Sequence, residues 1–359
     1  MSGRIDHFGW LEDAIKEGHI NSFDYTQFSI VKEAGRGGFA IVECAESELL
    51  ERKVALKSLR TDVSQLNEIS FQEFLRETKL LTDLNHPNVN KFYGITRRDP
   101  ERKMYMLVLQ YANKGNLRNH LASHKDSLGW EDKRQISLDI AEGIRYLHSK
   151  NIIHRDLHSK NVLVHNNRMM IADFGLSKCL DESTMTSNSN VKGMPGYIDP
   201  QCFLTYGFKR NKKSDIFSYG IILWEVSSCK IPSQFFNPYL LPLNPIEGTP
   251  RNFIELYKRC QNITPDERPN IEEIVSILTD PYFLKVYGDN SEKLLSQDRS
   301  ITNSYSKDSM SMIDESCVVL DTRQKDIQIN KSTYSTIDEI YIQILLFKSC
   351  GMRPKNGSE

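Results

Sequence analysis

The segment His154-Arg155-Asp156-Leu157-His158-Ser159-Lys160-Asn161 places an acid, a cation and an amide on one short loop, and Asp173-Phe174-Gly175 follows closely. Transfer of a phosphoryl group asks for little covalent chemistry from a protein, which must mainly hold metal ions, orient a hydroxyl and neutralise charge. Asp156 can accept the hydroxyl proton, while Asn161 and Asp173 carry the hard oxygen atoms that Mg²⁺ prefers. Either tripeptide alone could arise by chance, but both together, with an Asn between them, indicate phosphoryl transfer.

This pattern resembles the catalytic segment of the eukaryotic protein kinases, a family that places a nucleotide-binding lobe upstream of it. The stretch from Glu33 to Val42 reads as strand, glycine turn and strand, with Gly35, Gly37 and Gly38 allowing a close approach of the backbone to phosphates. Taken alone, such a run is more often an ordinary hairpin turn. The apolar strand Val54-Ala55-Leu56-Lys57 follows, and its Lys matches the family residue that holds the α and β phosphates, the alternative being a solvated strand lysine.

Lys57 needs an acidic partner, because a carboxylate must offset the desolvation of a partly buried ammonium. Apolar residues recur at helical spacing from Ser70 to Leu84, which predicts a helix there. Ser70 and Glu73 match a capping box, so Glu73 is expected at the start of this helix. Glu77 is therefore the expected partner, and it precedes an LxxLxHPN pattern as the family Glu does.

Composition disfavours several other classes of protein. The chain has 359 residues with 46 Lys and Arg against 47 Asp and Glu, so its net charge of -1 gives no basic field to attract nucleic acid. Seven Cys residues are scattered without a CxxC pair or zinc-ligand spacing, which indicates reduced thiols in an intracellular, cytoplasmic protein. We expect no signal peptide and no membrane span, since the apolar stretch 340–347 is too short to cross a bilayer.

The patterns along the chain predict three parts. Residues 1–23 form an extension whose stretch from Trp10 to Ile20 is expected to be an amphipathic helix with Trp10, Leu11, Ala14 and Ile15 on its packed face. Residues 24–286 form the main domain, and residues 287–359 have the polar composition of a largely disordered tail. Within the domain, a helix is expected over 136–147, and a second, apolar all round, over 215–226. Asp215 is a candidate cap for the second helix.

The resemblance covers about residues 24–286. Two stretches are similar to the tyrosine-kinase-like branch of the family: His158-Ser159-Lys160 within the catalytic segment, and Gly196-Tyr197-Ile198-Asp199-Pro200. The resemblance implies an α+β, bilobal protein kinase fold. A small, antiparallel β-rich N-terminal lobe with one main helix would be joined by a hinge to a larger, mainly helical C-terminal lobe. ATP would lie between the lobes, beside the hinge that follows a strand over 104–109, and Asp215 would anchor the backbone of the catalytic segment.

Carried over residue by residue, the resemblance assigns three groups of site residues. The catalytic residues would be Asp156, Lys160, Lys57 and Glu77. Mg²⁺ would be held by Asn161 and Asp173. ATP would contact Gly35, Gly37, Gly38, Val42, Ala55, Lys57, the gatekeeper Leu109, Gln110, Ala112 and Leu163. Lys160 would stabilise the transferred phosphate, with an exposed loop lysine as the alternative.

Three departures from the family pattern are visible. Ala40 replaces the third glycine of the phosphate loop, and its small side chain should preserve activity. Met194 stands where Ser/Thr kinases usually have a Thr that contacts the catalytic Asp and Lys. Gln201 replaces the Glu that normally pairs with the family Arg, here Arg268. We therefore expect a buried Arg without full charge compensation and a less stable helical lobe.

The implied activity is transfer of the γ-phosphate of ATP to a protein substrate. His158 and Lys160 give a mixed acceptor signature, so Ser/Thr is favoured and additional Tyr specificity stays open. The alternative is a pseudokinase scaffold, which Met194, Asp199 and Gln201 make conceivable. A small-molecule kinase is disfavoured by the HPN motif and the long activation segment.

Regulation by phosphorylation is the last expectation from the sequence. In the family, an Arg at the position of Arg155 can bind a phosphate on the activation segment with bidentate geometry. Candidate phosphorylation sites, for an upstream kinase or for the chain itself, are Ser183, Thr184, Thr186, Ser187 and Ser189. The alternative is a polar loop without any regulatory role.

Overall fold

The computed structural model describes residues 7–36, 40–59, 68–98, 105–179, 193–232 and 243–284, with the backbone alone at 7–8, 59 and 68–73. The chain divides into two units, Met1–Gly288 and Asp289–Glu359, and all described residues belong to the first. The predicted tail, 287–359, lies outside the described residues, as do Gly37, Gly38 and the five candidate phosphorylation sites. These predictions therefore stay untested.

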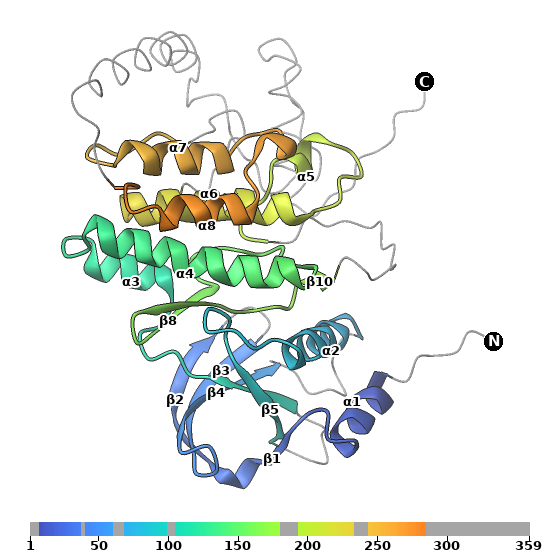
Figure 1. Ribbon diagram of the computed structural model, residues 1–359. Coiled ribbons are helices and arrows are strands. Elements are labelled where there is room, and N and C mark those ends of the chain that lie inside the picture. The colour runs from blue at the N-terminus through green and yellow to red at the C-terminus, as the bar shows by residue number, and fades with distance from the viewer. Residues whose placement is uncertain are drawn as a thin grey trace, which may run out of the picture. The chain divides into compact units, whose positions relative to one another are not determined.

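The N-terminal lobe is a six-stranded sheet with one main helix, α2 (Glu68–Thr82), packed on it (Figure 1). Its strands, in their order across the sheet, are β1 (Ser22–Asp24), β5 (Phe92–Arg97), β6 (Tyr105–Gln110), β4 (Arg52–Leu59), β3 (Ala40–Ser47) and β2 (Phe28–Arg36). Neighbouring strands are antiparallel except for β1, which runs parallel to β5. The predicted β-rich lobe is confirmed.

The register of this sheet brings predicted ATP contacts onto one face. Val42 of β3 lies opposite Lys57 of β4, and Ala55 of β4 lies opposite Leu109 of β6. Directly opposed residues share a face, and so do residues two apart along a strand. All four side chains therefore point to the same side of the sheet.

The C-terminal lobe is mainly helical. Its helices are α3 (Leu117–His124), α4 (Trp130–Ser149), α5 (Gln201–Leu204), α6 (Lys212–Ser228), α7 (Arg251–Cys260) and α8 (Ile271–Thr279). Two short antiparallel pairs accompany them, β7 (Ile152–Ile153) with β10 (Lys178–Cys179), and β8 (Val162–His165) with β9 (Arg168–Ile171). Helix α6 lies between α4 and α7 (Figure 1), and its side chains are buried nearly all round, as its apolar sequence predicts.

Helix boundaries correct three predictions. Helix α1 spans His7–Lys16 rather than 10–20, and Trp10 is 38% exposed while Leu11 and Ala14 are buried. Helix α2 begins at Glu68, so Ser70 lies inside the helix and is not its cap. Helix α6 begins at Lys212 with Asn211 as its cap, because the Asn211 side chain accepts hydrogen bonds from the backbone amides of the first turn. Asp215 is therefore not the cap of that helix.

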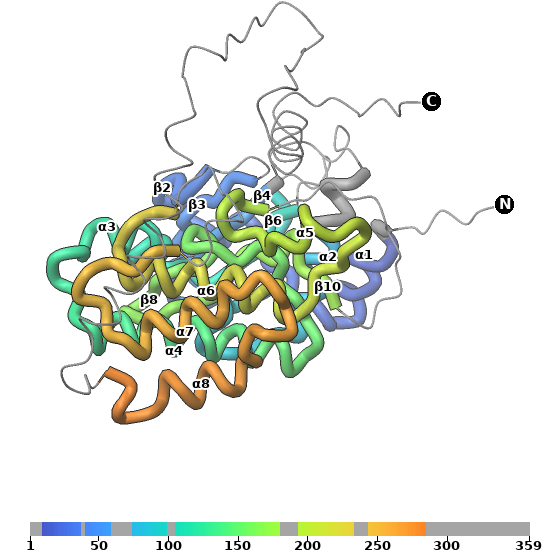
Figure 2. The backbone as a smooth tube through the Cα atoms, turned by 90° about the horizontal axis from the view of Figure 1, so that it is seen from above, coloured from blue at the N-terminus to red at the C-terminus, as the bar shows by residue number. Residues whose placement is uncertain are grey.

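The N-terminal extension is part of the sheet lobe. Strand β1 pairs with β5, and α1 lies beside α2 in both views (Figures 1 and 2). Glu12 of α1 accepts hydrogen bonds from Arg97 of β5, at 2.7 Å, and from the Tyr105 hydroxyl of β6. Leu11 is fully buried in the main core, so α1 contributes apolar as well as polar contacts.

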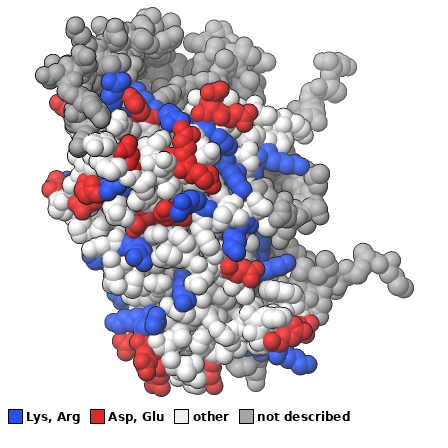
Figure 3. Space-filling model, in the orientation of Figure 1, with Lys and Arg blue, Asp and Glu red and all other residues white. Residues whose placement is uncertain are grey.

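Surface charges of both signs are interspersed on the face shown in Figure 3. The acidic and basic side chains alternate over the described residues of this face rather than gathering by sign. This distribution offers no basic stripe there of the kind that nucleic-acid binding uses. Among the helices that the structure describes, none is long and apolar enough to cross a membrane.

Candidate active site

Lys57 and Glu77 meet between the sheet and α2. The Lys57 Nζ atom donates to both Glu77 carboxylate oxygens, at 2.7 and 2.9 Å, and to Asp173 Oδ1 at 3.1 Å. The Lys57 and Glu77 side chains are 15% and 7% exposed, so the pair is largely removed from water. Burial alone would lower the pKa of Lys57, but the Glu77 and Asp173 carboxylates outweigh it and hold this pKa well above its usual value. Lys57 is thus a fixed cation.

Asp215 anchors the backbone of the catalytic segment. Its carboxylate accepts hydrogen bonds from the amides of His154 and Arg155, both at 2.9 Å, and contacts His148 Nε2 at 3.0 Å. Burial by itself would raise the pKa of Asp215, but these hydrogen bonds outweigh it and keep the pKa below its usual value. The anchored Arg155 has a positive φ of 69°. The anchoring role that the resemblance implied for Asp215 is present.

Asp156 is held by donors from both sides. Its Oδ1 atom accepts from the backbone amide of Met194 at 3.2 Å, and its Oδ2 atom lies 3.4 Å from Asn161 Nδ2. Gly193 makes the first contact feasible, since its φ is +134° and a Cβ there would lie 3.3 Å from Asp156 Oδ1. A main-chain amide therefore reaches the carboxylate where the family usually uses a Thr. Burial would raise the pKa of Asp156, but His158 and His154 outweigh it and lower the pKa.

Asn161 and Asp173 form a donor set that suits Mg²⁺. Asn161 Nδ2 donates to the Asp156 carbonyl at 3.0 Å, so the amide oxygen of Asn161 is the atom that is chemically able to act as a metal ligand. The neighbouring Lys57 ammonium is the largest influence on Asp173 and lowers the pKa of this carboxyl, which is half exposed. Among the described residues, no three His, Cys, Asp or Glu side chains gather into a metal site. The two oxygen ligands offered by Asn161 and Asp173 fit Mg²⁺, which takes few protein ligands and otherwise binds water and phosphate.

The remaining predicted ATP contacts that the structure describes lie on the sheet, in the segment that follows β6, and on β8. Ala55 and Leu109 are buried, while Val42, Gln110, Ala112 and Leu163 are half-buried. Gly35 lies on β2 opposite Val42. Lys160 is exposed at the end of the catalytic segment.

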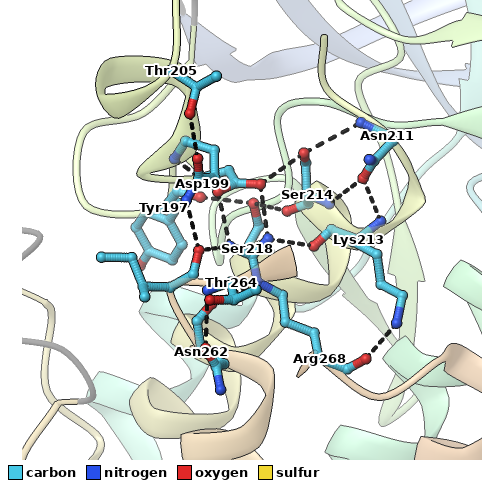
Figure 4. A network of polar contacts seen from close by, with 12 residues as sticks. Tyr197, Asp199, Thr205, Asn211, Lys213, Ser214, Ser218, Asn262, Thr264 and Arg268 are labelled. Atoms are coloured by element: carbon cyan, nitrogen blue, oxygen red, sulfur yellow. Dashed lines mark hydrogen bonds and ion pairs between the residues drawn. The ribbon is translucent and has the colours of Figure 1, made fainter. Parts of the chain in front are cut away.

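Arg268 corrects the expectation about charge compensation (Figure 4). Its guanidinium donates to both Asp199 oxygens, at 2.8 and 2.9 Å, and both side chains are fully buried. Gln201 instead donates to the Ile263 carbonyl at 2.9 Å. The buried Arg is therefore fully compensated, because a carboxylate two positions earlier has taken the place of the family Glu. The prediction of an undercompensated Arg268 was wrong.

Sequence reasoning did not find a polar cluster beneath the catalytic segment, which we call the Glu225 cluster. Glu225 of α6 accepts from Ser159 at 2.7 Å and from the Tyr197 hydroxyl at 2.5 Å, and it lies 3.4 Å from Arg118 Nε. Arg118 also donates to the Tyr197 hydroxyl at 2.8 Å. The only signal available was a Glu within the apolar sequence of α6, which needs a buried partner.

A model of the family described as protein tyrosine and serine/threonine kinase matches residues 28–278. A probable serine/threonine-protein kinase of Dictyostelium discoideum is 34% identical over 74% of this chain, but only 25% of its own length is covered. The serine/threonine/tyrosine-protein kinase HT1 of Arabidopsis thaliana is 32% identical over 64% of this chain and 60% of its own length.

The calcium/calmodulin-regulated receptor-like kinase 1 of Arabidopsis thaliana is 31% identical over 75% of this chain and 67% of its own length. The chain thus spans from a quarter to two thirds of these relatives. The family match covers most of both lobes and every motif described above. The chain therefore belongs to the protein kinase family.

Proposed function

We propose that this protein transfers the γ-phosphate of ATP to hydroxyl groups of protein substrates. The observation that carries the proposal is the convergence of Lys57, Glu77 and Asp173, which come from β4, α2 and the segment after β9, within hydrogen-bond distance. A cation fixed between two carboxylates suits binding of phosphate groups rather than a purely structural task. Asp156 and Asn161 lie on the same anchored segment, which supports their assignment to the acceptor and metal positions.

Each residue has a proposed task in the transfer. Lys57, oriented by Glu77, binds the α and β phosphates, and the sheet face with Val42, Ala55 and Leu109 receives the adenine side of ATP. Asn161 and Asp173 hold Mg²⁺, which when bound offsets the charge of the phosphate oxygens. Gly35, Gly37 and Gly38 supply backbone contacts to the phosphates, and Gln110, Ala112 and Leu163 complete the nucleotide contacts.

Asp156 orients the acceptor hydroxyl and accepts its proton. The lowered pKa of Asp156 keeps the carboxylate ionised at neutral pH, as a hydrogen-bond acceptor must be. Lys160 is exposed, so its side chain is positioned to contact the transferred phosphate once the substrate is bound.

Ser and Thr are the favoured acceptors. The relatives named as serine/threonine-protein kinases support this choice, and the name of HT1 keeps additional Tyr specificity open. The same names give no support to a pseudokinase. The scattered Cys residues support the expected cytoplasmic location, which stays a prediction.

Phosphorylation of the segment 180–192 is the proposed regulation. Burial and then the positive charges of Arg210 and Arg76 lower the pKa of Arg155, so three cations gather near the catalytic segment. A phosphate on one of the candidate hydroxyls would offset the mutual repulsion of these cations if it bound to them. Replacing Ser183, Thr184, Thr186, Ser187 and Ser189 together with Ala should lower the turnover of fully active protein. Unchanged turnover would exclude this regulation.

Incubation with ATP and Mg²⁺ followed by mass spectrometry tests the function and identifies the acceptor residues. The wild type should incorporate phosphate, mainly on Ser and Thr, and Asp156→Asn should lower the rate by about 10²- to 10⁴-fold. Equal incorporation by the wild type and Asp156→Asn would leave only the scaffold interpretation.

A further inference from the structure

His158 is a buried ring in the catalytic segment to which the proposed transfer gives no task. It is 5% exposed and lies two positions after Asp156. Its Nε2 atom lies 3.7 Å from Asp156 Oδ1, while its Nδ1 atom lies 3.2 Å from the backbone nitrogen of Asn161. The ring therefore stands between the proposed proton acceptor and a proposed metal ligand.

The contact with Asn161 determines which ring nitrogen carries hydrogen. The Asn161 N–H donates to the His158 carbonyl at 2.8 Å and also faces Nδ1 at 3.2 Å. A backbone N–H can only donate, so Nδ1 of His158 is an acceptor and the ring N–H that remains is on Nε2. Nε2–H is the atom that faces Asp156. The separation of 3.7 Å is longer than a direct hydrogen bond, and such contacts in active sites often tighten only when substrate binds.

The Glu225 cluster keeps the ring in this position. Tyr197 packs edge-on against His158 with 5.9 Å between the ring centroids, and its hydroxyl donates to Glu225. Ser159, the next residue after His158, also donates to Glu225. The ring is thus restrained by its buried neighbour and by its own backbone, as precise positioning of a catalytic group requires.

The donors around Asp156 distinguish its two oxygen atoms. Oδ1 faces the Met194 amide at 3.2 Å and His158 Nε2 at 3.7 Å. Among the residues that the structure describes, the only hydrogen-bond donor to Oδ2 is Asn161 Nδ2, at the longer distance of 3.4 Å. The Met194 amide donates to Oδ1, and His158 Nε2–H would add a second donor there once substrate binding draws the ring closer. Oδ2 would then be the better acceptor for a substrate hydroxyl.

We propose that His158 is a positioning residue for phosphoryl transfer, which donates from Nε2 to Asp156 Oδ1 and thereby directs Oδ2 to the acceptor hydroxyl. This inference rests on the kinase function proposed above. His158 thereby occupies the position that Ser/Thr kinases usually fill with Lys. The Lys160 proposal is independent of it, because Lys160 is exposed whereas His158 is buried.

Steady-state kinetics of the full chain tests the proposal through His158→Phe, which keeps an aromatic ring but has no donor. We expect kcat to fall by about 10- to 100-fold, with the KM for ATP within about twofold, because Asp156 acts on the acceptor rather than on the nucleotide. His158→Lys restores a donor and should recover kcat to within about tenfold of the wild type. His19→Phe is the matched control, since His19 is exposed and should leave kcat unchanged. A wild-type kcat in His158→Phe, or equal losses in the Phe and Lys variants, would overturn the proposal.

A second measurement does not depend on activity or on the folding of a variant. Long-range ¹H–¹⁵N correlation spectra of the wild-type chain with labelled His should show His158 protonated on Nε2 and unprotonated on Nδ1. A proton on Nδ1 would overturn the inference even in an active kinase. Conversely, a wild type that transfers no more phosphate than Asp156→Asn would refute the proposed function, whatever the tautomer of His158.

Discussion

Asp199 shows how one side chain can replace another when both reach the same partner. Arg268 is held by two hydrogen bonds from its guanidinium to the Asp199 carboxylate, and Ser214 donates to the same carboxylate at 2.8 Å (Figure 4). Removing one partner of a buried ion pair leaves an uncompensated charge, which is far more costly than losing one hydrogen bond to a backbone carbonyl. The stability of the C-terminal lobe therefore depends on Asp199 rather than on Gln201.

Asp199→Ala should lower the free energy of unfolding by about 3–5 kcal/mol, because it leaves Arg268 buried and unpaired. Gln201→Ala is the matched control and should cost only about 1 kcal/mol, since it removes two exposed hydrogen bonds between neutral groups, one to the Ile263 carbonyl and one from the Thr205 hydroxyl. Denaturant titration of both variants measures the difference. Equal costs for the two substitutions would show that the pair is not the anchor.

Asp215 gives the stability of the protein a component that depends on pH. Its pKa in the folded protein lies below the usual value of 3.8, so the carboxylate stabilises the fold above that pH and loses this effect as the pH falls through the folded pKa. Asp215→Asn should be less stable than the wild type by a constant amount at neutral pH, and this difference should narrow below about pH 4. Denaturant unfolding of both proteins at a series of pH values measures this difference in unfolding free energy. A difference that stays constant down to pH 2 would refute the assignment.

Local patterns predicted most of the elements that carry these residues. The sheet lobe, the helix that presents Glu77 and the long helix before the catalytic segment follow from alternating and helical spacing of apolar residues. Helix ends were less predictable. Ser70 matched a capping pattern but lies inside α2, and Asn211 rather than Asp215 caps α6, since a cap depends on where the backbone leaves the helix and several polar residues compete for that place.

The pairing of β1 with β5 was also not predictable. A three-residue strand has too few side chains to show a period, and parallel pairing depends on contacts distant in sequence. Its effect is to join the N-terminal extension to the sheet lobe. Because α1 packs beside α2, the extension also supports the helix that presents Glu77 to Lys57.

Leu11→Ala tests the role of α1. Leu11 is fully buried, so the truncation should lower the free energy of unfolding by about 2–5 kcal/mol. Trp10→Ala on the same helix is the control and should have little effect, because Trp10 is 38% exposed. In Leu11→Ala, both the unfolding temperature and the rate of phosphate transfer should fall. Equal unfolding temperatures for the two variants would mean that α1 does not support the lobe.

The assembled domain brings together residues that lie far apart in the chain. The order of the motifs predicted that Lys57, Glu77 and Asp173 would share one site, because the residues at these motif positions meet in the protein kinase family that the chain resembles. Spacing could not predict that Asp199 would replace Gln201 at Arg268, or that His158 would face Asp156. Both depend on which of several nearby side chains reaches a partner, and that is determined by tertiary packing rather than by position in the sequence.

Calorimetric titration of ATP with and without Mg²⁺, on the wild type and on Asp173→Asn, tests most directly whether these residues form a nucleotide site. Mg²⁺ should strengthen ATP binding to the wild type by at least about tenfold, and Asp173→Asn should lose most of that gain, because its amide is a weaker ligand than a carboxylate. Equal ATP affinity with and without Mg²⁺ in the wild type would refute the proposed site.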